Sequence, residues 1–288
     1  MLSRRSFIAM TAIALPRLLH AQTAKAAGSL DESLAELERV NGGRLGVAIL
    51  DTGTGARVGY RADERFPMCS TFKFLLVAAV LRRVDRHRDA LERAVGIPPK
   101  PLLFNSPLTE PHARRSMSVA ALCHAALTRS DNTAANLLLA SIGGPSGVTR
   151  FARSIGDKVT RLDRQEPALN ESLADDPRDT TSPMAMAGNL ESVLLKGVLS
   201  PASRDQLTAW MEQNQTGLDR LRAGLPQGWR VADKTGANGE HTSNDIAVFW
   251  PEGRPPLIAA AYITQCPGPE SKRAAMLAEI GRLARVSL

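Results

Sequence analysis

Apolar and polar positions along the chain follow two different periods, and these divide the chain into strand and helix regions. Apolar residues recur every three or four positions in several stretches, which is typical of amphipathic helices. The stretches with this helical period cover residues 30–40, 72–84, 118–128, 132–142, 200–211 and 271–285. Short β-type runs lie between and after them, at 44–50, 57–61, 229–232, 245–250 and 257–263. The strands therefore come from both ends of the chain, with most of the helices between them.

A sheet assembled from both chain ends, with helices inserted between its strands, is an α+β arrangement. We predict an antiparallel sheet flanked by N- and C-terminal helices, formed by residues 27–65 and 213–288. The segment 66–212 is predicted to be an inserted all-α domain. The glycines of 51–55 lie between two strands and not before a helix, which indicates a hairpin turn and argues against a dinucleotide-binding loop.

Residues 1–26 have the pattern of a cleavable export signal. Arg4 and Arg5 precede a short apolar run, and small residues follow it, with cleavage expected after Ala26 or, alternatively, after Ala21. The paired arginines favour the twin-arginine type, and a general secretory signal is the alternative. The apolar run is too short to anchor the chain in a bilayer. We therefore expect a soluble periplasmic protein that has no membrane contact after cleavage.

The charge balance changes once this segment is set aside. The chain of 288 residues has 36 Lys+Arg against 29 Asp+Glu, a net charge of +7 that would suit a nucleic-acid partner. Four of those charges lie in residues 1–26, which contain no acidic residue, so the rest of the chain carries +3. Aromatic residues make up only 4%, which argues against a base-stacking surface. No nucleic-acid partner is predicted, and a basic cluster near the end of the 72–84 helix is interpreted as a solvated face. This cluster consists of Arg82, Arg83, Arg86 and Arg88.

Cysteine and histidine positions give no indication of a metal site. The three cysteines and five histidines show neither C-x-x-C nor zinc-type spacing. No metal and no cofactor is predicted.

Two short motifs place a hydroxyl beside a cation. Ser70 and Lys73 form the only S-x-x-K, and on a helix they would share one face a turn apart. A helix N-terminus beside an ammonium suits an activated serine nucleophile, although a serine N-cap and a solvated lysine would look the same. Lys234, Thr235 and Gly236 end a predicted strand, where they could bind a carboxylate or form an ordinary turn junction.

A third motif, Ser130-Asp131-Asn132, precedes an apolar helix. Taken alone, it fits a helix-capping cluster. With all three motifs in this order, the chain resembles the class A serine β-lactamases, whose signature is S-x-x-K, S-D-N and K-T-G. The resemblance runs from about residue 30 to 283 and includes the run Ser-Asp-Asn-Thr-Ala-Ala-Asn-Leu-Leu at 130–138.

A fourth motif distinguishes the two enzyme types that share this signature. Residues 164–170, Arg-Gln-Glu-Pro-Ala-Leu-Asn, resemble the omega loop of the family, and Asp179 is expected to pair with Arg164 at its neck. Glu166 and Asn170 could hold a water and take its proton, whereas a penicillin-binding enzyme lacks this glutamate. The alternative for Glu166 by itself is a solvated surface acid.

The resemblance implies a mechanism for a secreted serine hydrolase that opens the β-lactam ring of penicillins and cephalosporins and so gives antibiotic resistance. Ser70 would form the acyl-enzyme, with the backbone N–H groups of Ser70 and Ala237 holding the oxyanion. Ser130 would pass a proton to the leaving nitrogen, and Glu166 would activate the deacylating water. Whether Lys73 or Glu166 is the base for acylation stays open.

The same resemblance implies how the drug is held. Lys234, Thr235 and Gly236 would bind its carboxylate, and Asn132 its side-chain amide. Arg220 stands where one branch of the family places its second carboxylate-binding cation. The partners expected are small β-lactams, and the protein is expected to act as a monomer.

Some positions depart from the commoner family patterns. Asn105 stands where an aromatic residue often walls the entrance. Asn238 and Val77 occupy the positions of the family partners of Cys69 and Cys123, so neither family disulfide is expected.

Two other functions remain open at this level. One is a low-turnover penicillin-binding enzyme, which would form a stable acyl-enzyme. The other is a non-catalytic drug sensor, which would need a membrane span or a partner domain to transmit its signal.

Overall fold

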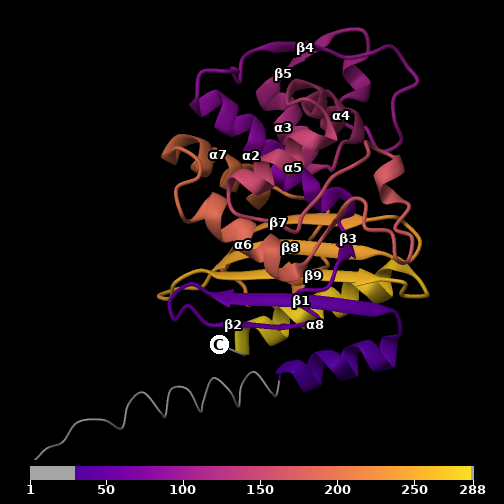
Figure 1. The fold of residues 1–288 in the computed structure, drawn as a ribbon, viewed down its shortest axis with the longest axis vertical. Coiled ribbons are helices and arrows are strands. Elements are labelled where there is room, and N and C mark those ends of the chain that lie inside the picture. The colour runs from indigo at the N-terminus through magenta and orange to yellow at the C-terminus, as the bar shows by residue number, and fades with distance from the viewer. Residues whose placement is uncertain (1–29, 287–288) are drawn as a thin grey trace, which may run out of the picture.

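Five antiparallel strands form the central sheet of the computed structural model, which describes residues 30–286 (Figure 1). Their order is β2-β1-β9-β8-β7, so the first long strand lies beside the last one and Ala48 pairs with Ala260. The strands are β1 Arg44–Asp51, β2 Arg57–Tyr60, β7 Arg230–Ala237, β8 Ser243–Trp250 and β9 Leu257–Thr264. The prediction of an α+β fold with an antiparallel sheet drawn from both chain ends is confirmed.

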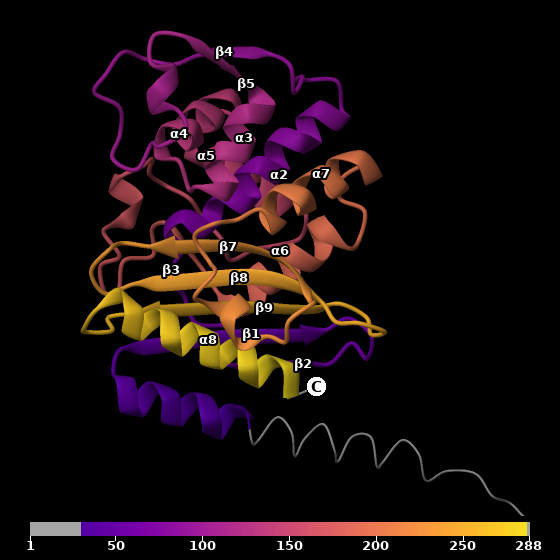
Figure 2. The same ribbon diagram turned by 180° about the vertical axis from the view of Figure 1, so that it is seen from behind.

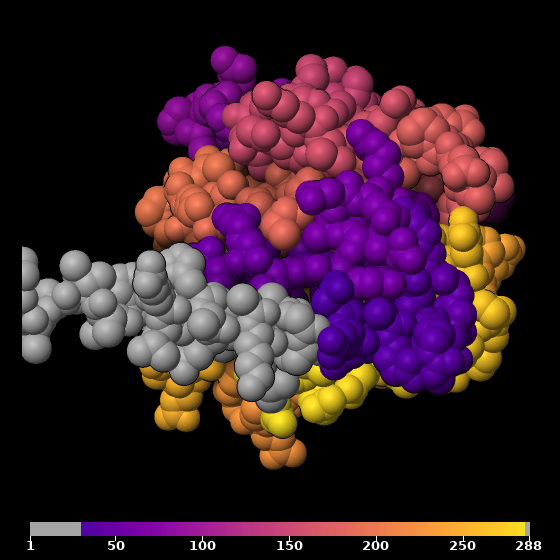
Figure 3. Space-filling model, turned by 60° about the horizontal axis from the view of Figure 1, so that its bottom comes forward, coloured from indigo at the N-terminus to yellow at the C-terminus, as the bar shows by residue number. Residues whose placement is uncertain are grey.

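The sheet is buried on both faces because its strands alternate between two apolar clusters. In β1, Val47 and Ile49 point to one cluster, whereas Ala48 and Leu50 point to the other. The helix of residues 30–41 and α8 (Glu270–Val286) cover the first face (Figure 2). Figure 3 shows the N-terminal elements, in indigo, beside the yellow end of the chain.

The other face of the sheet is covered by a helical layer centred on α2 (Phe72–Asp85). Ten consecutive residues of α2 are buried, and one of them is a lysine. The helices around it are α3 Val119–Thr128, α4 Asn132–Ser141, α5 Pro145–Ser154, α6 Pro183–Leu194 and α7 Pro201–Glu212. Because α2 is apolar on nearly all sides, it is stable only when other elements surround it, and it therefore lies at the centre of this layer.

Side-chain caps explain where several of these helices begin. Ser118 Oγ, Asp131 Oδ1 and Ser200 Oγ each accept a hydrogen bond from the backbone N–H three residues on, so α3, α4 and α7 start just after them. The sequence did not predict α5 or α6. Their start signals were present, since each has a proline in its first turn and α6 also has a Ser182 cap.

The segment 66–212 is mainly helical and also contains two short β-pairs. In one, β3 (Phe66–Pro67) pairs with β6 (Thr180–Thr181); in the other, β4 (Ala94–Gly96) pairs with β5 (Ser116–Ser118). Four 3₁₀ turns complete the described elements: η1 Cys69–Thr71, η2 Glu110–His112, η3 Ala168–Asn170 and η4 Leu221–Gly224. The division into two domains stays a prediction.

The predicted export signal, residues 1–26, lies outside the described residues. From residue 30 to 286, no helix combines the length and the apolar character needed to cross a membrane.

Candidate active site

Ser70 lies in η1, where the chain leaves β3 and enters α2, and its side chain is half-buried. Strand β7 packs directly against this turn at Gly236. A Cβ atom at position 236 would lie 2.6 Å from the Met68 carbonyl oxygen and 3.1 Å from Ser70 N. Only glycine therefore lets the strand approach the serine so closely, and this contact brings the K-T-G motif to Ser70.

Lys73, one turn further along α2, is a cation with no exposed surface. Its Nζ donates to Asn132 Oδ1 (2.7 Å), to the Ser130 carbonyl (2.8 Å) and to Ser130 Oγ (3.3 Å). It also lies 3.0 Å from Glu166 Oε1. Burial lowers the pKa of Lys73, and the carboxylate of Glu166 opposes this shift.

Glu166 is 4% exposed and contacts both the serine and the predicted water-binding amide. Ser70 Oγ donates to Glu166 Oε1 at 3.3 Å, and Asn170 Nδ2 donates to Glu166 Oε2 at 2.6 Å. Asn170 Oδ1 is buried and has no hydrogen-bond partner among the described residues. An acceptor in this position is available to a water beside the carboxylate.

The loop that carries Glu166 is closed at its neck by the predicted pair. Arg164 Nε donates to Asp179 Oδ2 at 2.5 Å, and the backbone N–H groups of Asp163 and Arg164 donate to Asp179 Oδ1. Asp179 is 1% exposed, so its charge is balanced almost wholly by these donors. These hydrogen bonds join the two ends of the loop to each other. The backbone N–H of Met68 also donates to the Asp179 carbonyl and attaches the neck of the loop to the segment before Ser70.

Ser130 and Lys234 meet across the helical layer and the sheet. Lys234 Nζ donates to Ser130 Oγ at 3.2 Å and to the Thr235 carbonyl at 2.8 Å. Ser130 Oγ therefore accepts from both Lys73 and Lys234, which leaves its own proton free to be donated. Burial lowers the pKa of Lys234 well below its usual range, and the positive charges of Lys73 and Arg220 lower it further.

The other two members of the S-D-N motif have different roles in the fold. Asp131 caps α4, and it also accepts hydrogen bonds from the backbone N–H groups of Leu108 and Thr109. Asn132 uses its Oδ1 for Lys73, while its Nδ2 donates to the Phe104 carbonyl at 2.9 Å. The capping interpretation is thus correct for Asp131, and Asn132 lies within the cluster of polar side chains.

Strand β7 (Arg230–Ala237) carries the remaining predicted residues. The K-T-G motif lies at the end of this strand, as the sequence predicted, and Ala237 is its last residue. Arg220 reaches the back of the same strand, where Nη1 donates to the Gly236 carbonyl (3.1 Å) and Nη2 to Glu270 Oε1 (2.8 Å). The structure brings Arg220 to the K-T-G backbone, and none of the hydrogen bonds of its guanidinium goes to the side chains of Lys234 or Thr235.

Three residues that the sequence analysis did not single out hold the site in shape. Asn136 binds both backbone groups of Glu166, because its Nδ2 donates to the Glu166 carbonyl (2.9 Å) and its Oδ1 accepts from the Glu166 N–H (3.1 Å). Asn244 Nδ2 donates to the carbonyl of Met68 at 3.0 Å, and the Thr216 hydroxyl bonds that of Thr235. Asn136 lies in the run 130–138 and could have been found there; the other two lack a local signal.

The cysteines and acidic groups of the described residues build no other chemistry here. Cys69, Cys123 and Cys266 are free and buried thiols, and burial raises the pKa of Cys69 to about 12. Within residues 30–286, no cluster of His, Cys, Asp or Glu could hold a metal ion. The reactive groups of the site are two serines, two buried lysines and one carboxylate.

Comparisons with known proteins point to one family over the whole described chain. The model of the beta-lactamase enzyme family matches residues 29–287. Beta-lactamase L2 of Stenotrophomonas maltophilia is 47% identical, with 99% of this chain and 98% of that protein covered. Beta-lactamase CTX-M-25 of Escherichia coli is 46% identical, with 94% and 93% covered.

Solved structures agree with these sequence comparisons. An ancestral class A beta-lactamase (GNCA) is 57% identical and superposes with a TM-score of 0.88, covering 90% of this chain and 100% of that one. A beta lactamase from Xanthomonas campestris is 51% identical and has a TM-score of 0.89, with 90% and 97% covered.

Proposed function

Since the chain belongs to the class A β-lactamase family and hydrolyses β-lactams, we propose that it opens the ring through an acyl-enzyme on Ser70. Ser70 Oγ attacks the lactam carbonyl carbon and gives its proton to the pair formed by Lys73 and Glu166. Glu166 Oε1 contacts both partners, since Lys73 Nζ lies 3.0 Å and Ser70 Oγ lies 3.3 Å from it. Either member can be the acceptor: Glu166 as a carboxylate, or Lys73 after it has passed one of its protons to Glu166, which lies 3.0 Å away.

The oxyanion that forms on the carbonyl is held by the backbone N–H groups of Ser70 and Ala237. The close contact of Gly236 with the Ser70 turn supports this assignment, since it aligns β7 beside the serine backbone. Ser130 then gives its proton to the leaving lactam nitrogen and regains one from Lys73, so the proton taken from Ser70 is passed on and Glu166 is again a carboxylate. Its hydroxyl oxygen accepts from two lysines, and this arrangement supports a donor role for its proton.

Deacylation uses a water held between Glu166 and Asn170. Glu166 takes a proton from this water, which attacks the ester carbonyl carbon and releases Ser70. The observation that carries the proposal is the geometry around Glu166. Its carboxylate binds Ser70 on one oxygen and Asn170 on the other, and Asn170 Oδ1 is left as a buried acceptor beside them.

The substrate carboxylate is bound at the edge formed by Lys234, Thr235 and Gly236, and Asn132 holds the side-chain amide of the drug. The buried ammonium of Lys234 supplies an unscreened positive charge at this edge. Arg220 supports the carboxylate site from behind, because its guanidinium binds the Gly236 carbonyl and keeps positive charge next to the strand.

Class A β-lactamases are typically periplasmic, and we propose that residues 1–26 direct this chain there by the twin-arginine route. The mature protein acts as a monomer. Fractionating cells that express the full chain, with and without substitution of Arg4 and Arg5 by lysine, tests the route. Size-exclusion chromatography of the periplasmic protein tests the oligomeric state.

The decisive experiment replaces Glu166 by Gln, which keeps the shape of the side chain and removes the base. The variant is expected to accumulate a covalent adduct, seen by mass spectrometry after mixing with a penicillin, while steady-state turnover falls about 10²- to 10⁴-fold. Asp175→Asn, an exposed acid of the same loop, is the matched control and should turn over as the wild type does. Unchanged turnover in Glu166→Gln would remove the assigned role. A single stoichiometric burst by the wild type would indicate a penicillin-binding enzyme instead.

A further inference from the structure

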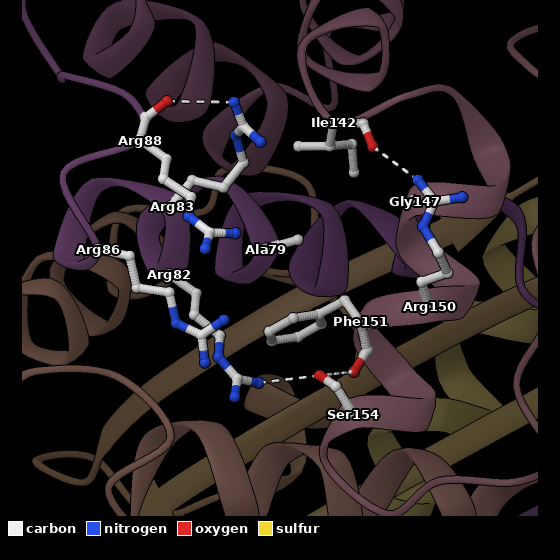
Figure 4. A pocket seen from close by; sticks show the side chains of 10 residues that line it. All are labelled: Ala79, Arg82, Arg83, Arg86, Arg88, Ile142, Gly147, Arg150, Phe151 and Ser154. Atoms are coloured by element: carbon white, nitrogen blue, oxygen red, sulfur yellow. Dashed lines mark hydrogen bonds between the residues drawn. The ribbon is translucent and has the colours of Figure 1, made fainter.

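The last turns of α2 and the facing side of α5 line an open hollow, and its lining residues are distinct from the candidate active-site residues (Figure 4). Its volume is about 260 Å³, and its apolar floor is made by Ala79, Ile142 and Phe151. Five arginines line it, and we call this hollow the arginine pocket. They are Arg82, Arg83, Arg86 and Arg88 around the end of α2, and Arg150 on α5. The sequence analysis had interpreted the first four as a solvated helix face, and the structure gives that face a concave shape.

The positive charge of the arginine pocket is only partly offset within the described part of the chain, where the carboxylate of Asp89 attracts Arg83. None of its five arginines forms an ion pair there, and their hydrogen bonds go to neutral groups. Arg82 donates to Ser154 Oγ (2.9 Å), and Arg83 donates to the Arg88 carbonyl (3.1 Å). Arg150 donates to Ser146 Oγ and to the Ile142 carbonyl. Burial and the positive charge of Arg86 lower the pKa of Arg82.

The acidic residues nearest in the sequence are engaged elsewhere. Asp85 accepts hydrogen bonds from the Ser200 N–H and from the hydroxyls of Ser200 and Ser203 at the start of α7. Asp89 is bound by Arg93 through both carboxylate oxygens. Arg83 Nε is moreover a buried donor that has no partner among the described residues. A group of five cations that has a spare donor and little counter-charge is stabilised by a bound anion.

We propose that the arginine pocket binds a phosphate-bearing anion. Guanidinium groups present paired N–H donors that match two oxygens of a phosphate, and five arginines from α2, the residues after it and α5 line one hollow. The volume is below the roughly 300–1,000 Å³ of pockets that enclose drug-sized molecules, so it suits a compact group. The apolar floor formed by Phe151 and Ile142 would contact a carbon chain or ring attached to that phosphate.

Such a group can come from a soluble phosphate ester or from the headgroup of an anionic lipid. Both carry the same tetrahedral oxyanion, and the pocket chemistry is the same for both. The binding is independent of β-lactam hydrolysis, since none of the residues proposed for catalysis lines this hollow.

The test measures binding of sodium tripolyphosphate to the mature protein by titration calorimetry at low ionic strength. The variant Arg86→Gln/Arg88→Gln removes two charges from exposed side chains that form no side-chain hydrogen bond within residues 30–286. Its matched control is Arg39→Gln/Arg282→Gln, which removes two exposed arginines from the helices on the far face of the sheet. We expect the dissociation constant to rise at least tenfold in the first variant and less than twofold in the control. An absence of binding by the wild type, or an equal loss in both variants, overturns the proposal.

Two further measurements locate the anion and identify its source. Tripolyphosphate that occupies the arginine pocket should leave KM for a cephalosporin unchanged. Competitive inhibition that persists in Arg86→Gln/Arg88→Gln would place the anion at the catalytic lysines and overturn the proposal. Vesicles of phosphatidylglycerol, compared with vesicles of phosphatidylcholine, distinguish the two sources. Sedimentation with the anionic vesicles that is lost in the first variant and kept in the control supports a lipid headgroup as the source, and tripolyphosphate binding without sedimentation supports a soluble phosphate.

Discussion

Asn136 offers the sharpest test of how the site is held together, because one side chain fixes both backbone groups of Glu166. Replacing it by alanine removes the hydrogen bonds of 2.9 and 3.1 Å to the Glu166 carbonyl and N–H. A buried backbone group that loses its partner costs about 1–3 kcal/mol, so the loss of both partners should lower the free energy of unfolding by about 2–6 kcal/mol. Asn136→Asp keeps the acceptor but turns an oxygen toward the Glu166 carbonyl oxygen, so at least half of this loss is expected, because the donor is lost and the two oxygens repel each other.

The kinetic effect should fall mainly on deacylation. A shift of about 1 Å in a catalytic group can cost about 100-fold in rate, and the residue that Asn136 positions is the one that activates water. Acylation keeps Ser70, Lys73 and Ser130, so the acyl-enzyme should accumulate while kcat and KM both fall.

Stopped-flow kinetics with a chromogenic cephalosporin separate the burst from the steady state, and mass spectrometry measures the acylated fraction. Urea unfolding measures the change in stability. The reasoning fails if Asn136→Ala keeps wild-type kcat and the same unfolding midpoint. It also fails if the burst phase slows as much as the steady state does, because the side chain would then act on acylation as well.

Three further predictions test other parts of the site. Lys234 is protonated below its lowered pKa, so kcat/KM should decline as pH rises through a value below the usual 10.5 for lysine. Lys234→Arg should abolish that decline in a pH profile, and an identical decline in both proteins would contradict the assignment. Burial raises the pKa of Asp245, so the folded state binds a proton that the unfolded state releases, and stability falls as pH rises above about 3.8. Asp245→Asn should therefore be more stable than the wild type at pH 7 and lose this advantage on acidification, as thermal unfolding at several pH values will show; a pH-independent difference would refute the assignment. Gly236→Ala would place a Cβ 2.6 Å from a backbone oxygen, so acylation should fall about 100-fold by stopped-flow measurement, and a wild-type rate would disprove the close contact.

Much of the fold could be predicted from local patterns. The alternation of β1 and β9 and the three-to-four spacing of the helix at 30–41 depend on which face of each element meets the core, and the sequence records this directly. The helices α5 and α6 were missed although their start signals were present, Pro145 for α5 and Pro183 after Ser182 for α6, and the helical period of α5 is stronger than that of α3 or α4. The short β-pairs β3–β6 and β4–β5 were also missed, since strands of two or three residues show no period at all.

The chemistry was predicted from the order and spacing of four motifs, and the structure brings Ser70, Lys73, Ser130, Glu166 and Lys234 into one hydrogen-bonded cluster. Their residue types and spacing could be seen in the sequence, because each reactive group can be supplied only by particular side chains. The supports could not, because Asn244 and Thr216 act through contacts between segments far apart in the chain.

By itself, the sequence determined which residues could do chemistry and how the apolar faces divide between two clusters. Only the tertiary structure decided that Lys73 and Lys234 share one hydroxyl, that Arg220 lies behind β7, and that the arginines of α2 line a hollow with Arg150 of α5. The physical reason is that the pattern of apolar and polar residues along the chain shows only which face of its own helix or strand each residue occupies. Charge and hydrogen bonding depend on which elements pack together, and that is set by the whole core.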